Sequence, residues 1–106
     1  MIRILKIVAF AVMLCAGAGV SLHAQQKKPF RVVAFYTGKN DKAHISFMHE
    51  AHKWFTNMGH KYSFTYDSTK NWNDMNAAFL ARYQMVVFLD TRPDEPSQRA
   101  AFEQYM

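Results

Sequence analysis

Three short apolar segments alternate along the chain with segments of helical pattern. Residues 31–37 form a run rich in β-branched and aromatic residues that ends at Gly38, which is typical of a buried strand. Residues 62–66 alternate aromatic with small polar side chains and predict a second strand. Residues 84–90 form another continuous apolar run, which predicts the third strand.

The segments between these strands have helical periodicity. From Phe47 to Met58 the apolar residues recur at intervals of one, three and four positions and so fall on one face of a helix, and Gly59 predicts the end of that helix. Residues 76–83 predict a short helix. Residues 94–106 predict a last helix, with Pro96 near its start.

This order of elements predicts an α/β fold with a parallel sheet and helices on its faces. Right-handed crossovers place the first strand between the other two, in the flavodoxin-like order 2-1-3. The segment Met85–Leu89 would then lie at an open edge without a charge or a proline to protect it. We therefore expect three strands of a truncated sheet, with residues 31–106 as the first part of a larger domain.

The N-terminal residues have the pattern of a secretory signal peptide. Arg3 and Lys6 precede an uncharged run over residues 7–20, which is shorter than the about 20 residues needed to span a bilayer. We expect a signal peptide at residues 1–24, a polar leader at 25–30, and a secreted or periplasmic product that is not inserted in a membrane after cleavage. A retained N-terminal anchor is the alternative.

Composition narrows the class of protein further. Four glycines, three prolines and one cysteine exclude a collagen-like, disordered or disulfide-dense chain. The single cysteine, Cys15, lies in the leader, so no cysteine nucleophile remains after cleavage. The formal net charge of +5 falls by two with Arg3 and Lys6, and the other cations form no basic stripe, so no nucleic-acid partner is expected.

The candidate site lies where the first and third strands end. Ligands of an open α/β sheet bind beyond the carboxyl ends of the strands at the switch point, where loops 37–44 and 90–95 would meet. The candidate catalytic residues are His44, as general acid or base, and Asp90, which could orient His44 or a substrate hydroxyl. The candidate substrate-binding residues are Thr37, Gly38, Ser46, Thr91 and Arg92.

Each of these residues also has a purely structural interpretation. His44 could be bonded to its own loop, Asp90 could cap a turn, and Arg92 could be a solvated cation. Residues 37–38 could also cradle a phosphate, which is the basis for a flavodoxin-like electron carrier as a further alternative. The sequence identifies no cofactor.

Two other features suggest chemistry on their own. His49 and His52 are spaced so that they could chelate a metal, but no third ligand is evident and we predict no metal site. Trp72 is either a platform for sugar stacking or a lid over the core.

Several segments together resemble the ThuA-like family, the trehalose-utilisation domains of the class I glutamine-amidotransferase-like group. The resemblance is carried by residues 31–37, 42–46, 81–91 and 98–105. The histidine of the family falls on His44, with Ser46 two residues further on. The resemblance implies a flavodoxin-type fold, of which this chain would be the N-terminal half, and action on oxidised or keto-sugars.

The expected function is therefore that of an exported ThuA-like fragment whose intact form binds or processes a small carbohydrate. The alternative is a non-catalytic fragment or interaction module that completes its sheet with another chain. From the 106-residue chain itself we expect no catalysis, because half of the walls of the site would be missing.

Overall fold

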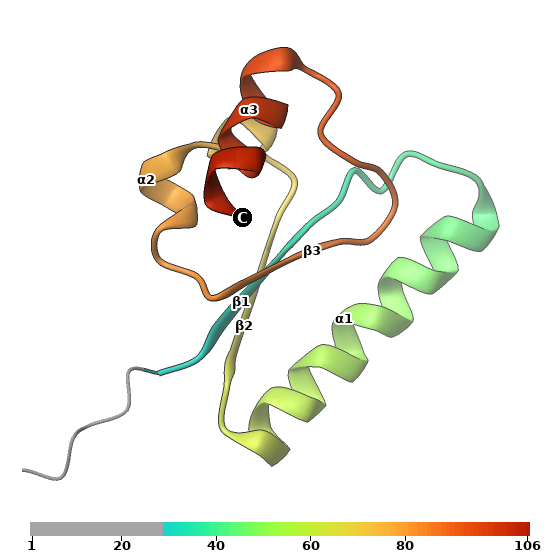
Figure 1. The fold of residues 1–106 in the computed structure, drawn as a ribbon. Helices are drawn as coiled ribbons and strands as arrows, with labels where there is room; N and C mark the ends of the chain where they lie inside the picture. Colours follow the sequence, from blue (N-terminus) through green and yellow to red (C-terminus); the bar gives the residue numbers. More distant parts are fainter. Residues whose placement is uncertain (1–28) are drawn as a thin grey trace, which may run out of the picture.

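A parallel three-stranded sheet is the centre of the protein. The computed structural model describes residues 29–106, so the predicted signal peptide and most of the leader lie outside the described residues. The strands are β1 (Arg31–Phe35), β2 (Thr65–Thr69) and β3 (Met85–Phe88), and β1 lies in the middle (Figure 1). The order β2-β1-β3, with both pairings parallel, confirms the predicted topology.

The middle strand has the most buried residues of the fold. Val33 of β1 pairs with Asp67 of β2 and Val86 of β3. Residues 32–35 are at most 2% exposed, because strands flank β1 on both sides and helices cover both faces of the sheet (Figure 1). This is the burial expected of a continuous apolar strand in a parallel sheet.

One face of the sheet is covered by the helix α1 (Lys42–Tyr62). Met48 and Ala51 of this helix are buried in a cluster with Ala34 and Leu89. The predicted apolar face was too broad, however, because Phe47 and Trp54 are 55% and 56% exposed. A straight helix on a sheet contacts it along a narrow stripe, and these two side chains lie outside that stripe.

The end of α1 differs from the prediction. Gly59 lies inside the helix, and Ser63 is the C-cap, with a left-handed φ of 59° and an N–H that donates to the Gly59 carbonyl. A Cβ on Gly59 would lie 2.7 Å from the carbonyl oxygen of Phe64, so glycine is required there for close packing rather than to end the helix. The longer helix displaces the second strand from residues 62–66 to Thr65–Thr69.

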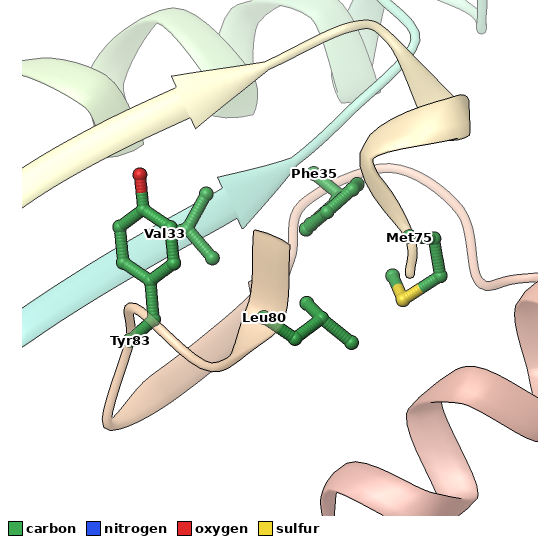
Figure 2. Close-up of a cluster of buried hydrophobic side chains, with 5 residues drawn as sticks. All are labelled: Val33, Phe35, Met75, Leu80 and Tyr83. Carbon is green, nitrogen blue, oxygen red and sulfur yellow. The ribbon is translucent and has the colours of Figure 1, made fainter. Parts of the chain in front are cut away.

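The other face holds the larger apolar cluster. It is covered by the 3₁₀ turn η1 (Trp72–Asp74), the short helix α2 (Ala77–Leu80) and the helix α3 (Pro96–Tyr105) (Figure 1). The buried members of the cluster, drawn in Figure 2, are Val33, Phe35, Met75, Leu80 and Tyr83.

Trp72 closes this cluster at the carboxyl end of the sheet. Its ring lies 5.3 Å from that of Phe35, and its indole N–H donates to the Tyr36 carbonyl at 3.3 Å. Trp72 is therefore a lid over the core.

The outer edge of β3 is unpaired within the part of the chain that the structure describes. Met85 on this strand is 45% exposed. Of the helices over residues 29–106, none combines the length and the apolar character needed to cross a bilayer.

Candidate functional site

The loops that follow β1 and β3 are joined through Asp90. One carboxylate oxygen of Asp90 accepts from the Thr37 amide at 2.8 Å, and the other accepts from the Thr37 hydroxyl at 2.8 Å and from the Gly38 amide at 2.7 Å. The Asn40 side chain donates to the Asp90 carbonyl at 2.6 Å. Gly38 adopts a φ of +70°, which favours glycine. The predicted meeting of the two loops is present in the structure.

These hydrogen bonds favour the ionised form of Asp90. Partial burial opposes ionisation, but the hydrogen bonds from Gly38 and Thr37, together with the charge of nearby His44, outweigh it and lower the pKa of Asp90. Asp90 is thus an anion whose oxygens hold the Thr37–Gly38 turn. Within residues 29–106 no hydrogen bond joins Asp90 to His44.

His44 is oriented by a different acid, Asp41. Because α1 begins at Lys42, His44 lies in its first turn rather than before it, and Asp41 is the N-cap. One Asp41 oxygen accepts from the His44 amide at 3.0 Å, and the other lies 2.8 Å from His44 Nδ1. The hydrogen bonds to the backbone and side chain of His44 lower the pKa of Asp41. The imidazole is 53% exposed and, among the described residues, only its Nδ1 has a hydrogen-bond partner.

A cavity of about 310 Å³ lies beside this imidazole. It is lined by His44 together with Ala43, Phe47 and Leu89. Its walls are therefore mainly apolar, with one ring that can donate or accept a proton. A ligand there could present an apolar face to Phe47 and Leu89 and a polar atom to His44.

The remaining predicted residues are less closely grouped. Thr37 and Gly38 are part of the loop contact with Asp90, Thr91 is partly exposed beyond β3, and Ser46 is exposed on α1. Arg92 is not at the His44 cavity. It lines a separate one with Pro93 and Arg99 on the α3 side of the sheet.

Sequence reasoning missed two residues near the loops. Asp41 orients His44. An aspartate three residues before His44, at the start of a helix, is a typical N-cap, and this signal could have identified it. Lys70 places its ammonium 5.6 Å from the Tyr36 ring and 3.7 Å from where a Cβ on Gly38 would lie. Lys70 directly follows β2, so correct bounds for that strand would have placed it at the carboxyl edge.

His49 and His52 lie in the middle of α1. Among the described residues, they are not grouped with a third side chain that could help to hold a metal ion. His52 Nδ1 lies 2.8 Å from the Tyr66 hydroxyl, and the ring meets that of Tyr36 edge to face at 4.6 Å. Desolvation, with the charge of His49, lowers the pKa of His52, while burial raises the pKa of Tyr66 to about 12. Across residues 29–106 no three His, Cys, Asp or Glu side chains are grouped so that they could hold a metal ion.

Comparison with known proteins gives one similar solved structure. It is the crystal structure of a protein from Bacteroides uniformis ATCC 8492 that is described as ThuA-like. The two share 31% sequence identity with a TM-score of 0.68, over 76% of this chain and 33% of the other. The chain thus spans one third of the length of that protein. No family model matches the chain. Comparison with curated proteins likewise found no match.

Proposed function

We propose that this chain is the N-terminal part of an exported ThuA-like domain and that the loops after β1 and β3 bind a carbohydrate. The similarity to the Bacteroides uniformis protein supports the ThuA-like assignment. The observation that carries the site is the Asp41–His44 pair, whose 2.8 Å contact holds an exposed imidazole beside a cavity.

The chemistry of this pair suits a sugar hydroxyl. When Nδ1 donates its proton to the Asp41 carboxylate, Nε2 carries a lone pair and can accept from a hydroxyl or remove its proton. The carboxylate holds the ring in that tautomer. The apolar wall at Phe47 and Leu89 then complements the C–H face of a sugar ring.

Binding to the full 106-residue chain tests this proposal. Trehalose and a keto-sugar are titrated separately into isotopically labelled protein, and amide shifts are followed by NMR. We expect shifts in residues 37–44 and 89–91, and we expect His44→Ala to weaken binding at least about tenfold, which corresponds to about 1.4 kcal/mol.

The matched control is His60→Ala, which removes an exposed histidine at the other end of α1 and should leave binding unchanged. Equal affinity of the His44→Ala variant and the unmodified chain would remove His44 from the site. Shifts in neither titration would contradict the carbohydrate proposal.

A second candidate function is association through the open edge of β3. The unpaired backbone groups of Met85–Phe88 form a template for another strand, and Met85 is an exposed apolar side chain on this strand. Antiparallel pairing of β3 with β3 of a second copy would extend the sheet across a two-fold axis.

The mass of the purified chain in solution tests this pairing. We expect a dimer whose population rises with protein concentration, and we expect Met85→Lys to give a monomer because a charge at the edge opposes pairing. Met106→Lys adds the same charge at a side chain that is 81% exposed on the C-terminal residue and should leave the dimer intact. A folded monomer at all concentrations would contradict self-pairing.

A further inference from the structure

The β3–α3 loop forms a second cavity, which we call the arginine pocket. It has a volume of about 420 Å³ and is lined by Phe88, Arg92, Pro93, Arg99 and Phe102. Phe88 belongs to β3 and Phe102 to α3, so the pocket lies on the α3 side of the sheet, whereas the His44 cavity is lined from α1. The two cavities share no lining residue, and the arginine pocket is a separate candidate site.

The base of the arginine pocket is aromatic and fixed in place. The rings of Phe88 and Phe102 lie 5.0 Å apart at 73°, an edge-to-face contact, and both rings pack against the core cluster. Pro93 is buried beside them. A ligand therefore meets a preformed apolar surface there and need not order a mobile loop.

The rim of the pocket carries more positive than negative charge. Arg92 Nε lies 3.7 Å from a carboxylate oxygen of Asp94, and Arg99 donates to the backbone carbonyl of Asp94 at 3.1 Å. The Asp94 carboxylate thus pairs with Arg92, whereas Arg99 contacts only the neutral backbone oxygen of Asp94. The Arg92 side chain is 85% exposed, so its outer N–H groups can reach a ligand.

We propose that the arginine pocket binds a small organic oxyanion that carries a ring-sized apolar group. A guanidinium donates two parallel hydrogen bonds to a carboxylate or phosphate, which accounts for the anionic end. The rings of Phe88 and Phe102 bury the apolar end. A neutral sugar has no oxyanion to pair with the guanidinium groups, and the two cavities share no lining residue, so this site is independent of the proposed carbohydrate site.

Phenyl phosphate is the probe that separates the two features, because it joins an oxyanion to an aromatic ring. In NMR titrations of the full 106-residue chain we expect shifts in residues 88–103 but not in residues 37–44. Inorganic phosphate and phenol, each with one of the features, should both bind at least about tenfold more weakly. Equal affinity for phenyl phosphate and inorganic phosphate would overturn the proposal.

Substitutions that remove a positive or a negative charge test the role of the charged side chains at the rim. Arg92→Gln and Arg99→Gln should each weaken phenyl phosphate binding about tenfold or more, as expected for the loss of a charge-assisted hydrogen bond. Lys53→Gln, an exposed cation on α1, is the control.

Asp94→Asn should have the opposite effect, since it frees Arg92 while it leaves the backbone carbonyl that Arg99 contacts. We expect binding severalfold tighter than in the unmodified chain, a gain that unfolding cannot produce. Glu50→Gln changes the net charge equally on α1 and should have no effect. A loss of affinity in the Asp94→Asn variant, or unchanged affinity in both arginine variants, would also contradict the proposal.

Discussion

The contacts of single side chains near the ends of β1 and β3 can be predicted only partly from residue type and sequence position. Asp90 was expected where the loops after β1 and β3 meet, and it lies there, with its two oxygens accepting three hydrogen bonds from Thr37 and Gly38. The acid that orients His44 is Asp41 instead. Sequence order places both carboxylates near the loops, but only the path of the backbone decides which one reaches the imidazole.

The stability of the loops should depend on the charge of Asp90. In Asp90→Asn an amide NH₂ would face at least one backbone donor, and we expect the free energy of unfolding to fall by about 1–3 kcal/mol. Denaturant unfolding of both proteins measures the difference. Asp94→Asn, at an exposed pair with Arg92, should change it by less than about 1 kcal/mol. Equal effects of the two substitutions would refute this assignment.

His52 should make stability depend on pH in the acidic range. Its pKa in the folded chain is lowered from 6.5 by burial and by His49, so below pH 6.5 the unfolded chain binds more protons than the folded one. Stability is therefore complete above pH 6.5 and is lost as the pH falls through the folded-state pKa. The ring contacts the Tyr36 ring edge to face and the neutral hydroxyl of Tyr66, which offer it no compensating charge.

Unfolding free energies measured at intervals between pH 7.5 and pH 4.5 check this dependence. We expect His52→Gln to flatten the loss of stability that begins below pH 6.5, while His60→Gln, at an exposed position, should retain it. The same slope in the His52→Gln variant and the unmodified chain would show that another group is responsible.

At the level of elements, α1 shows what periodicity can and cannot predict. The apolar spacing correctly indicated a helix whose buried residues include Met48 and Ala51. It missed the first turn, where Lys42 and His44 interrupt the apolar residues, and the last turn, which continues past Gly59 to Tyr62. A glycine ends a helix only when it adopts a left-handed conformation, and here Ser63 does so instead.

The left-handed cap predicts a stabilising substitution. Ser63→Gly removes the strain of a φ of 59° on a residue with a side chain, and we expect a gain of about 0.5–1 kcal/mol, seen as a higher Tm. Gly59→Ala should lower Tm, because its Cβ would lie 2.7 Å from the Phe64 carbonyl oxygen. Thermal unfolding of both variants checks the pair. A Tm of Ser63→Gly at or below that of the unmodified chain would contradict this account.

For the whole molecule, the order of the elements was the most informative signal. Continuous apolar strands and right-handed crossovers were enough to predict the parallel order 2-1-3. The error of three residues at β2 had a larger effect on the site, because it hid Lys70 at the carboxyl edge of the sheet. Strand order follows from the handedness of the crossover connections. The ends of strands depend on where the neighbouring helices are capped, and a single sequence indicates those caps only weakly.

The hydrogen bonds that the Thr37 and Gly38 amides donate to Asp90 also couple the opening of this turn to the separation of β3 from β1. When β3 separates locally from β1, these amides lose their acceptor at the same moment as the strand amides lose theirs. In deuterated water the turn should therefore take up label in step with β3, far more slowly than other loop amides. The loop after β1 shares the opening free energy of the sheet, and a ligand that holds it closed would protect the third strand as well.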